Sequence, residues 1–161
     1  MMLIAIELLL IIFLGLICFQ DLKERKVSIW ILVLGLVVGG YINYAHQQPI
    51  VFLSNTIINS VFVVTVFLIL WGYATLKMKK NIFSVFGKGD LFFFMLLAVS
   101  LPILSFLMVF IFSIIFALLV FILLKNSMKE KTVPLAGLQA LFFGLVLIAN
   151  NFVPSLNIYA L

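Results

Sequence analysis

The sequence predicts an all-α fold, a polytopic membrane bundle of about six transmembrane helices. Of its 161 residues, 66% are hydrophobic and only 9% are charged, and the mean hydropathy is +1.40. An ordinary soluble domain is about half apolar and about a quarter charged, so most of this surface must face lipid. We expect one domain over residues 1–161, because the chain leaves no room for a second domain of ordinary size.

Six apolar runs divide the chain, and a helix that crosses the hydrocarbon core needs about 20 residues. The first run lacks a basic start and a small-residue cleavage site, so we interpret it as a retained span and not as a signal peptide. The third is long enough to tilt, and the fourth is short. Proline disfavours helix at the preceding residue, so Leu91–Leu124 is either one helix kinked at Pro102 or two helices. The runs are Leu3–Phe19, Ile29–Ala45, Ile50–Leu76, Leu91–Leu101, Ile103–Leu124 and Val133–Ala149.

The positions of the basic residues favour six spans over five. All ten basic residues fall in three clusters, and the connections at 46–49 and 100–102 contain no lysine or arginine. Six spans place the three clusters on one face, whereas five place the last cluster on the other, against the positive-inside rule. We therefore predict six spans with both termini outside and the basic loops in the cytoplasm. The clusters are Lys23, Arg25 and Lys26; Lys77, Lys79, Lys80 and Lys88; and Lys125, Lys129 and Lys131.

The remaining composition excludes several classes of site. The net charge of +5 indicates topology and contact with anionic lipid, and the basic residues are too few and too dispersed for nucleic-acid binding. A single cysteine, Cys18, excludes a disulfide framework and a cysteine-rich zinc site. A single histidine, His46, cannot build a histidine metal site or a serine-histidine-aspartate triad. We predict no metal and no cofactor.

The chain has only two aspartates, and each stands at the edge of an apolar run on the same predicted face. Asp21 follows the first run, and Asp90 precedes the fourth within the segment GKGD at residues 87–90. If the first and fourth spans touch, like charge opposes double ionisation, so one carboxyl keeps a proton while the other deprotonates water. Aspartic proteases use this arrangement. Gly87 and Gly89 would allow backbone conformations barred to other residues and a close approach of substrate.

Simpler explanations exist for each of these polar groups. Asp90 could only cap a helix, and Asp21 could only pair with Arg25 four residues later. Glu7 within the first span is either partly hydrated or protonated near the outer surface, or bonded to Asn55 or Asn59 of another span. A strip of small residues in the second span indicates helix packing within the bundle or an assembly interface. The strip consists of Gly35, Gly39 and Gly40.

Three segments resemble the peptidase domain of the type IV prepilin peptidases, membrane aspartic proteases of the G-x-G-D kind. DLKERKVS at residues 21–28 resembles the family's first aspartate segment, and GKGD at residues 87–90 matches the second. VPLAG at residues 133–137, with Pro134, resembles the proline-containing opening of the last family helix. The likeness in order and spacing covers nearly the whole chain.

The resemblance implies a catalytic pair, Asp21 and Asp90, with Gly87, Gly89 and Pro134 as supporting residues. It implies an aspartic endopeptidase of the bacterial cytoplasmic (inner) membrane without a cofactor. The family cleaves the basic leader of type IV prepilins and pseudopilins at the cytoplasmic face. The hydrophobic helix of the substrate would then lie in the bilayer beside the enzyme.

The chain departs from the family pattern in ways that concern substrate preference. The family often has proline where Ser28 stands, and a basic residue soon after the second aspartate, where this chain has LFF at residues 91–93. Larger members carry an N-terminal methyltransferase segment, and this chain resembles the short, peptidase-only form. The alternative function is that of a non-catalytic membrane homologue, an assembly factor of a pilus or secretion system. The sequence predicts no particular oligomeric state.

Overall fold

The computed structural model describes residues 2–79, 87–124, 133–153 and 157–160. Within these ranges the chain forms six α-helices and no strand, which confirms the predicted all-α class. The basic residues Lys80, Lys125, Lys129 and Lys131 lie outside the described residues. The helices are α1 (Met2–Glu24), α2 (Ile29–His46), α3 (Pro49–Leu76), α5 (Lys88–Ser100), α6 (Ile103–Leu124) and α7 (Leu135–Phe152).

Five of the described helices are long and apolar enough to cross a membrane. The exception, α5, has 13 residues, which at about 1.5 Å per residue is shorter than a hydrocarbon core of about 30 Å. The break near Pro102 separates two helices, because α5 ends at Ser100 and α6 begins at Ile103. The polytopic helical bundle predicted from the sequence is therefore confirmed, with α5 as its shortest member.

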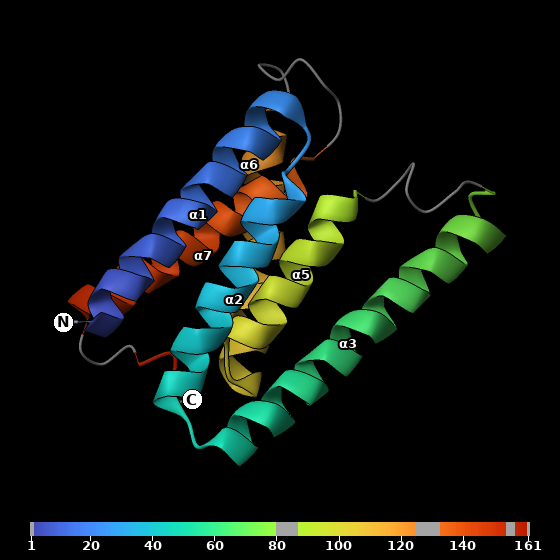
Figure 1. Cartoon of the computed structure of the whole chain (residues 1–161). Helices are drawn as coiled ribbons and strands as arrows, with labels where there is room; N and C mark the ends of the chain where they lie inside the picture. Colours follow the sequence, from blue (N-terminus) through green and yellow to red (C-terminus); the bar gives the residue numbers. More distant parts are fainter. Residues whose placement is uncertain (1, 80–86, 125–132, 154–156, 161) are drawn as a thin grey trace.

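Successive helices alternate in direction, and both termini lie at one end of the bundle (Figure 1). α1 packs mainly against α7 and α2, α2 packs against α5, and α6 lies on α7. As a result, the end of α1, the start of α5 and the start of α7 gather at the end of the bundle away from the termini (Figure 1). We call this end the aspartate end, and the other the terminal end.

The glycine strip of α2 packs inside the bundle. A Cβ atom added to Gly39 would clash with Ser100 Oγ, and one added to Gly35 would lie 2.8 Å from Leu96 Cδ1. Both contacts are with α5, so the absence of side chains at these positions allows α2 and α5 to approach closely. Of the two interpretations of this strip, helix packing within the bundle is the one that the structure supports.

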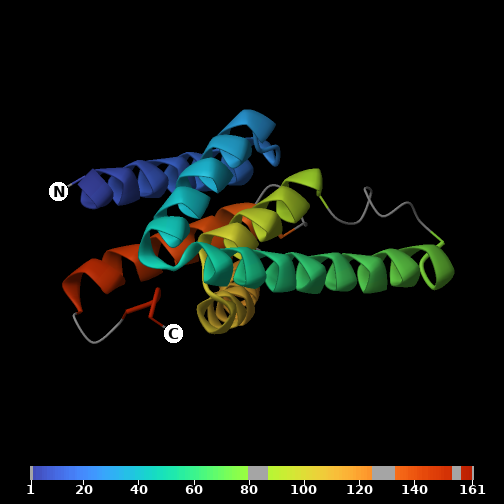
Figure 2. The ribbon, with the colours of Figure 1, turned by 60° about the horizontal axis from the view of Figure 1, so that its bottom comes forward.

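α3 lies at the edge of the bundle and is attached by its first half (Figure 2). Asn59 Nδ2 donates hydrogen bonds to the carbonyl oxygens of Ala98 and Leu101, both at 3.0 Å. Val63, one turn further along, is fully buried. Between Val63 and the buried Ala74, no residue of α3 is buried. The second half of α3 therefore contributes little to the core.

Glu7 is buried at the terminal end, with 6% of its surface exposed. Its Oε2 accepts a hydrogen bond of 3.2 Å from Asn151 Nδ2 of α7. Neither asparagine of α3 that the sequence suggested is this donor, since Asn59 bonds to α5 and Asn55 donates to Gln47 Oε1. The polar contact between spans is therefore present, but its partner is on a different helix.

Candidate active site

Three segments that are remote in sequence meet at the aspartate end. Asp21 lies in the last turn of α1, Asp90 lies in the first turn of α5, and α7 begins at Leu135. Asp21 is buried, with 7% of its surface exposed, and Asp90 is partly buried. The fold thus brings together the two aspartates that the sequence singled out.

The first turn of α7 binds both carboxylates. Gly137 N donates a hydrogen bond of 2.7 Å to Asp21 Oδ2, and Ala136 N donates one of 2.8 Å to Asp90 Oδ1. Because Ala136 and Gly137 are successive residues of one helical turn, the carboxylates that they bind must lie side by side.

The start of α7 can bind two acids because it has no cap of its own. Pro134 is its N-cap residue and makes no side-chain cap hydrogen bond, so the first amides of the helix need partners from elsewhere. Asp21 and Asp90 supply them. The positive end of the helix dipole also stabilises negative charge at this position. Pro134, predicted as a supporting residue, therefore stands two residues before Ala136, the first of the two amides that bind the pair.

The glycines of the GKGD segment adopt ordinary backbone conformations, contrary to one part of their predicted role. Gly87 has a φ of −69°, Gly89 lies within α5, and no glycine among the described residues has a positive φ. The expectation of special backbone conformations here was therefore wrong. Gly87 is instead the N-cap residue of α5, and its N donates a hydrogen bond of 3.1 Å to Asp90 Oδ2. A Cβ on Gly87 would lie 3.0 Å from that oxygen, so glycine leaves space for the carboxylate.

Asp90 therefore does more than cap its own helix. One carboxylate oxygen accepts from Gly87 in α5's first turn, while the other accepts from Ala136 in α7. Asp90 lies outside the five helices that are long enough to cross a membrane. Its burial, together with the nearby charge of Asp21, raises its pKa to about 6, although the hydrogen bonds from Ala136 and Gly87 act in the opposite direction. A pKa near 6 lets this carboxyl carry a proton under mildly acidic conditions.

Asp21 also has the predicted neighbour, Arg25. The backbone N of Arg25 donates a hydrogen bond of 3.2 Å to the Asp21 carbonyl, and its φ of 54° turns the chain out of α1.

A comparison with models of known protein families identifies the family of this chain. The model of the type IV leader peptidase family matches residues 8–122, a stretch that contains both aspartates and the GKGD segment. The chain belongs to the type IV leader peptidase family. No curated protein and no solved structure was found to match it.

Two residues of this leader peptidase's site were not predicted as site residues, Ala136 and Gly137. They lie beyond the matched stretch, and they contribute backbone N–H groups, which no side-chain pattern reveals. Gly137 also has a steric role, because a Cβ atom there would lie 2.8 Å from Asp21 Cβ and 3.3 Å from the Cys18 carbonyl oxygen. The available signal was a small-residue pair that follows Pro134 and Leu135 at the opening of a helix.

Metal-binding groups do not gather around this site. Across the part of the chain that the structure describes, no three histidine, cysteine, aspartate or glutamate side chains are grouped so that they could hold a metal ion.

Proposed function

We propose that this leader peptidase is an aspartic endopeptidase that cleaves the leader of type IV prepilin-like proteins, with Asp21 and Asp90 as its catalytic pair. The observation that carries the proposal is the binding of both carboxylates by successive amides of α7. An arrangement that only capped helices would not need two acids side by side, because like charges close together oppose each other's ionisation.

The pair divides the chemistry between an acid and a base. Asp90, whose pKa is raised to about 6, holds the shared proton, and Asp21, whose Oδ2 accepts the hydrogen bond of 2.7 Å from Gly137 N, is the ionised partner. Asp21 takes a proton from a water molecule, whose oxygen attacks the scissile carbonyl carbon, while Asp90 donates its proton to the carbonyl oxygen. Collapse of the resulting gem-diol breaks the C–N bond, the proton held by Asp21 passes to the leaving amine, and one gem-diol hydroxyl returns its proton to Asp90, which restores the starting pair.

The α7 amides position the two acids for this exchange. Each amide uses one carboxylate oxygen, Asp21 Oδ2 or Asp90 Oδ1, and fixes the orientation of the other. Positioning of this kind lowers the entropic cost of reaching the reacting geometry. The hydrogen bonds also partly offset the repulsion between the carboxylates, so the bundle can hold them together before substrate arrives.

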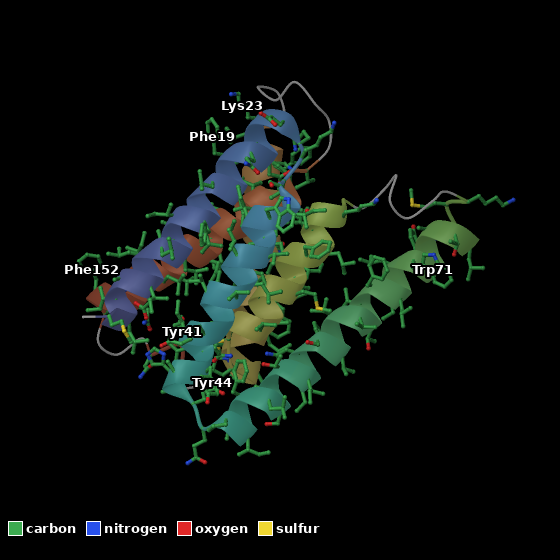
Figure 3. All side chains as sticks on the ribbon, viewed as in Figure 1. Phe19, Lys23, Tyr41, Tyr44, Trp71 and Phe152 are labelled. Carbon is green, nitrogen blue, oxygen red and sulfur yellow. The ribbon has the colours of Figure 1, made fainter. Side chains whose placement is uncertain are left out.

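We also propose that the aspartate end faces the cytoplasm of a bacterial inner membrane, with both termini outside. Lys23 lies at this end of the bundle, and Phe152 lies at the other (Figure 3). Lys77 and Lys79 follow the end of α3, and Lys88 begins α5, so the described cations of three segments lie toward the same end of the molecule as the aspartates (Figure 1). The positive-inside rule places such an end in the cytoplasm, where anionic lipid headgroups would contact it.

The test is cleavage of a prepilin-like substrate by purified protein in detergent or lipid. Asp21→Asn and Asp90→Asn should each lower kcat by about 10²–10⁴-fold, the usual loss when an acid or base is removed. Glu7→Gln is a matched control, because it neutralises another buried acid at the opposite end of the bundle. It should leave kcat unchanged. Full cleavage by either asparagine variant would refute the pair, and inactive wild type against all such substrates would favour a non-catalytic assembly factor.

A further inference from the structure

An apolar hollow lies between α3 and α5, next to the turn that carries Asp90. Its volume is about 230 Å³, and its lining is wholly apolar. It begins on α3 one residue after Val63, the last fully buried residue of the attached half of that helix. The lining residues are Val64 and Phe67 from α3 and Leu91, Phe92 and Met95 from α5.

The hollow exists because α3 separates from the bundle as it approaches the aspartate end (Figure 1). The hydrogen bonds of Asn59 attach α3 at the far end of α5, and the two helices diverge from there. Val64 is 44% exposed and Phe92 is 38% exposed, so both walls of the hollow are open to an incoming group.

We propose that this hollow docks the apolar transmembrane helix of the leader-bearing substrate. The inference rests on the proposed function and adds a substrate-binding surface to it. A lining without polar groups favours an apolar partner. A cavity of about 150 Å³ admits a benzene molecule, so this volume accepts one or two large side chains, as in knobs-into-holes packing between helices.

The position of the hollow relative to the carboxylates constrains how the substrate lies. Asp90 contacts α7, whereas Leu91 and Met95 face α3, so a bound chain must pass over the start of α5. A helix is about 10 Å across, and an extended chain spans about 3.3–3.6 Å per residue. The cleaved bond should therefore lie about three or more residues before the first docked residue.

Charge that follows the end of α3 bears on the segment that connects the docked helix to the cleaved bond. Lys77 and Lys79 follow α3 at this end, and both are exposed. They favour a connecting segment that is neutral or acidic and disfavour a basic one. The hollow reaches the same turn of α5 as Asp90, with Leu91 directly after Asp90 in its lining, which favours substrate over a lipid tail or a second copy of the chain as the occupant.

Crosslinking tests where the substrate helix lies. In a Cys18→Ala, Asp90→Asn background, which keeps substrate uncut, a cysteine at Met95 is compared with one at Ile115, an exposed position on α6. The partner is a prepilin-like protein with one cysteine in its apolar helix. We expect a disulfide with the Met95→Cys variant and much less with Ile115→Cys. Equal crosslinking at both positions, or crosslinking to a second copy of the chain alone, would overturn the docking site.

Cleavage of two substrates separates a failed docking site from a failed active site. Val64→Trp, which fills the hollow, should raise KM for the full-length substrate by about 10- to 100-fold, the loss expected when large apolar side chains find no pocket. A soluble peptide that spans the cleaved bond without the apolar helix should be cut as by wild type, which also shows that the variant folds. Leu118→Trp, on the exposed face of α6, is the control.

The outcomes of this experiment are distinct. Val64→Trp with unchanged KM for the full-length substrate would refute docking in the hollow, and would indicate that lipid fills it. Wild type that cleaves neither substrate would refute the proposed function itself, and the docking site with it.

Discussion

Buried polar groups lie at both ends of the bundle, but the groups that lie next to them differ between the two ends. At the terminal end, Glu7 accepts a hydrogen bond from the Asn151 amide, and Asn43 Nδ2 donates to the Val99 carbonyl oxygen. Each acceptor there meets a neutral donor. At the aspartate end, Asp21 and Asp90 converge on one helix start.

The difference indicates which end carries chemistry. A carboxylate paired with an amide links two helices at little electrostatic cost, whereas two adjacent carboxylates repel each other and raise the cost of ionising the pair. The hydrogen bonds at the terminal end are those that helix packing alone requires. The aspartate end holds an arrangement that destabilises the folded protein unless a proton is shared, which is typical of a functional site.

Among substitutions outside the aspartate pair itself, the largest effect is expected from Gly137→Ala. Its Cβ would lie 2.8 Å from Asp21 Cβ, so the carboxylate must move away from the α7 amide, and misplacement by about 1 Å can cost about 10²-fold in rate. We expect kcat to fall by about 10²-fold with little change in KM. Gly144→Ala is the control on the same helix, because its nearest contact would be 4.0 Å from Leu14 Cβ. Equal activity of the two variants would show that the close contact with Asp21 does not matter.

The next largest effect should be the pH dependence of kcat/KM, which should depend on the aspartate end and not on the terminal end. Because Asp90 holds the catalytic proton and its pKa is raised to about 6, kcat/KM should fall above that pH by about tenfold per unit. The Glu7→Gln variant should follow the same profile. A profile that stays flat from pH 5 to about 8 would contradict the role of Asp90 as the acid.

The raised pKa of Asp90 also makes the stability of the folded protein depend on pH. Between pH 3.8 and about 6 the folded protein binds more protons at Asp90 than the unfolded chain does, so its stability falls as the pH rises through this range. Asp90→Asn should remove this decrease in thermal unfolding experiments in detergent. A decrease of equal size in the variant would assign it to another group.

Gly39→Ala should produce a smaller effect of a different kind. Its Cβ would clash with Ser100 Oγ, which separates α2 from α5 without touching the carboxylates. We expect a loss of stability of about 1–3 kcal/mol, as for overpacked cores, with kcat of the folded fraction preserved. Adding Ser100→Gly should restore much of the stability. If kcat collapses in the folded variant, the aspartate end depends on this packing more than the structure indicates.

The smallest effect is expected from Glu7→Gln. Glutamine keeps an oxygen that can accept from Asn151, so the variant should lose at most about 1 kcal/mol in thermal unfolding and none of its activity. Asn151→Leu, which leaves Glu7 without this donor, should cost more than Glu7→Gln. Loss of cleavage with Glu7→Gln would mean that the terminal end also takes part in catalysis.

Much of the fold could be predicted from the sequence, because lipid imposes simple patterns. The apolar runs gave the helices, Pro102 marked the break between α5 and α6, and the basic clusters placed Asp21 and Asp90 at one end. The shortness of α5 was also visible in the run Leu91–Leu101. These features depend only on the composition of short segments, which can be read directly from a single sequence.

The details of the site depend on contacts between remote segments, and these were harder to predict. The α7 amides that bind the pair belong to the backbone of Ala136 and Gly137 and have no side-chain signature. Gly87 caps α5 with ordinary dihedral angles, although its residue type suggested a special conformation. The partner of Glu7, Asn151, is 144 residues away, and only the packing of α1 against α7 identifies it.

Titration of the two aspartate carboxyls tests most directly whether they act as one pair. The chain contains only Asp21 and Asp90, so protein labelled with ¹³C at the aspartate carboxyl carbon has two signals to follow by NMR. We predict that each signal shifts in two steps as the pH changes, because the protons belong to the pair, and that Asp21→Asn leaves Asp90 with a single step at lower pH. Two independent single-step titrations, with that of Asp90 unchanged by Asp21→Asn, would contradict the shared site.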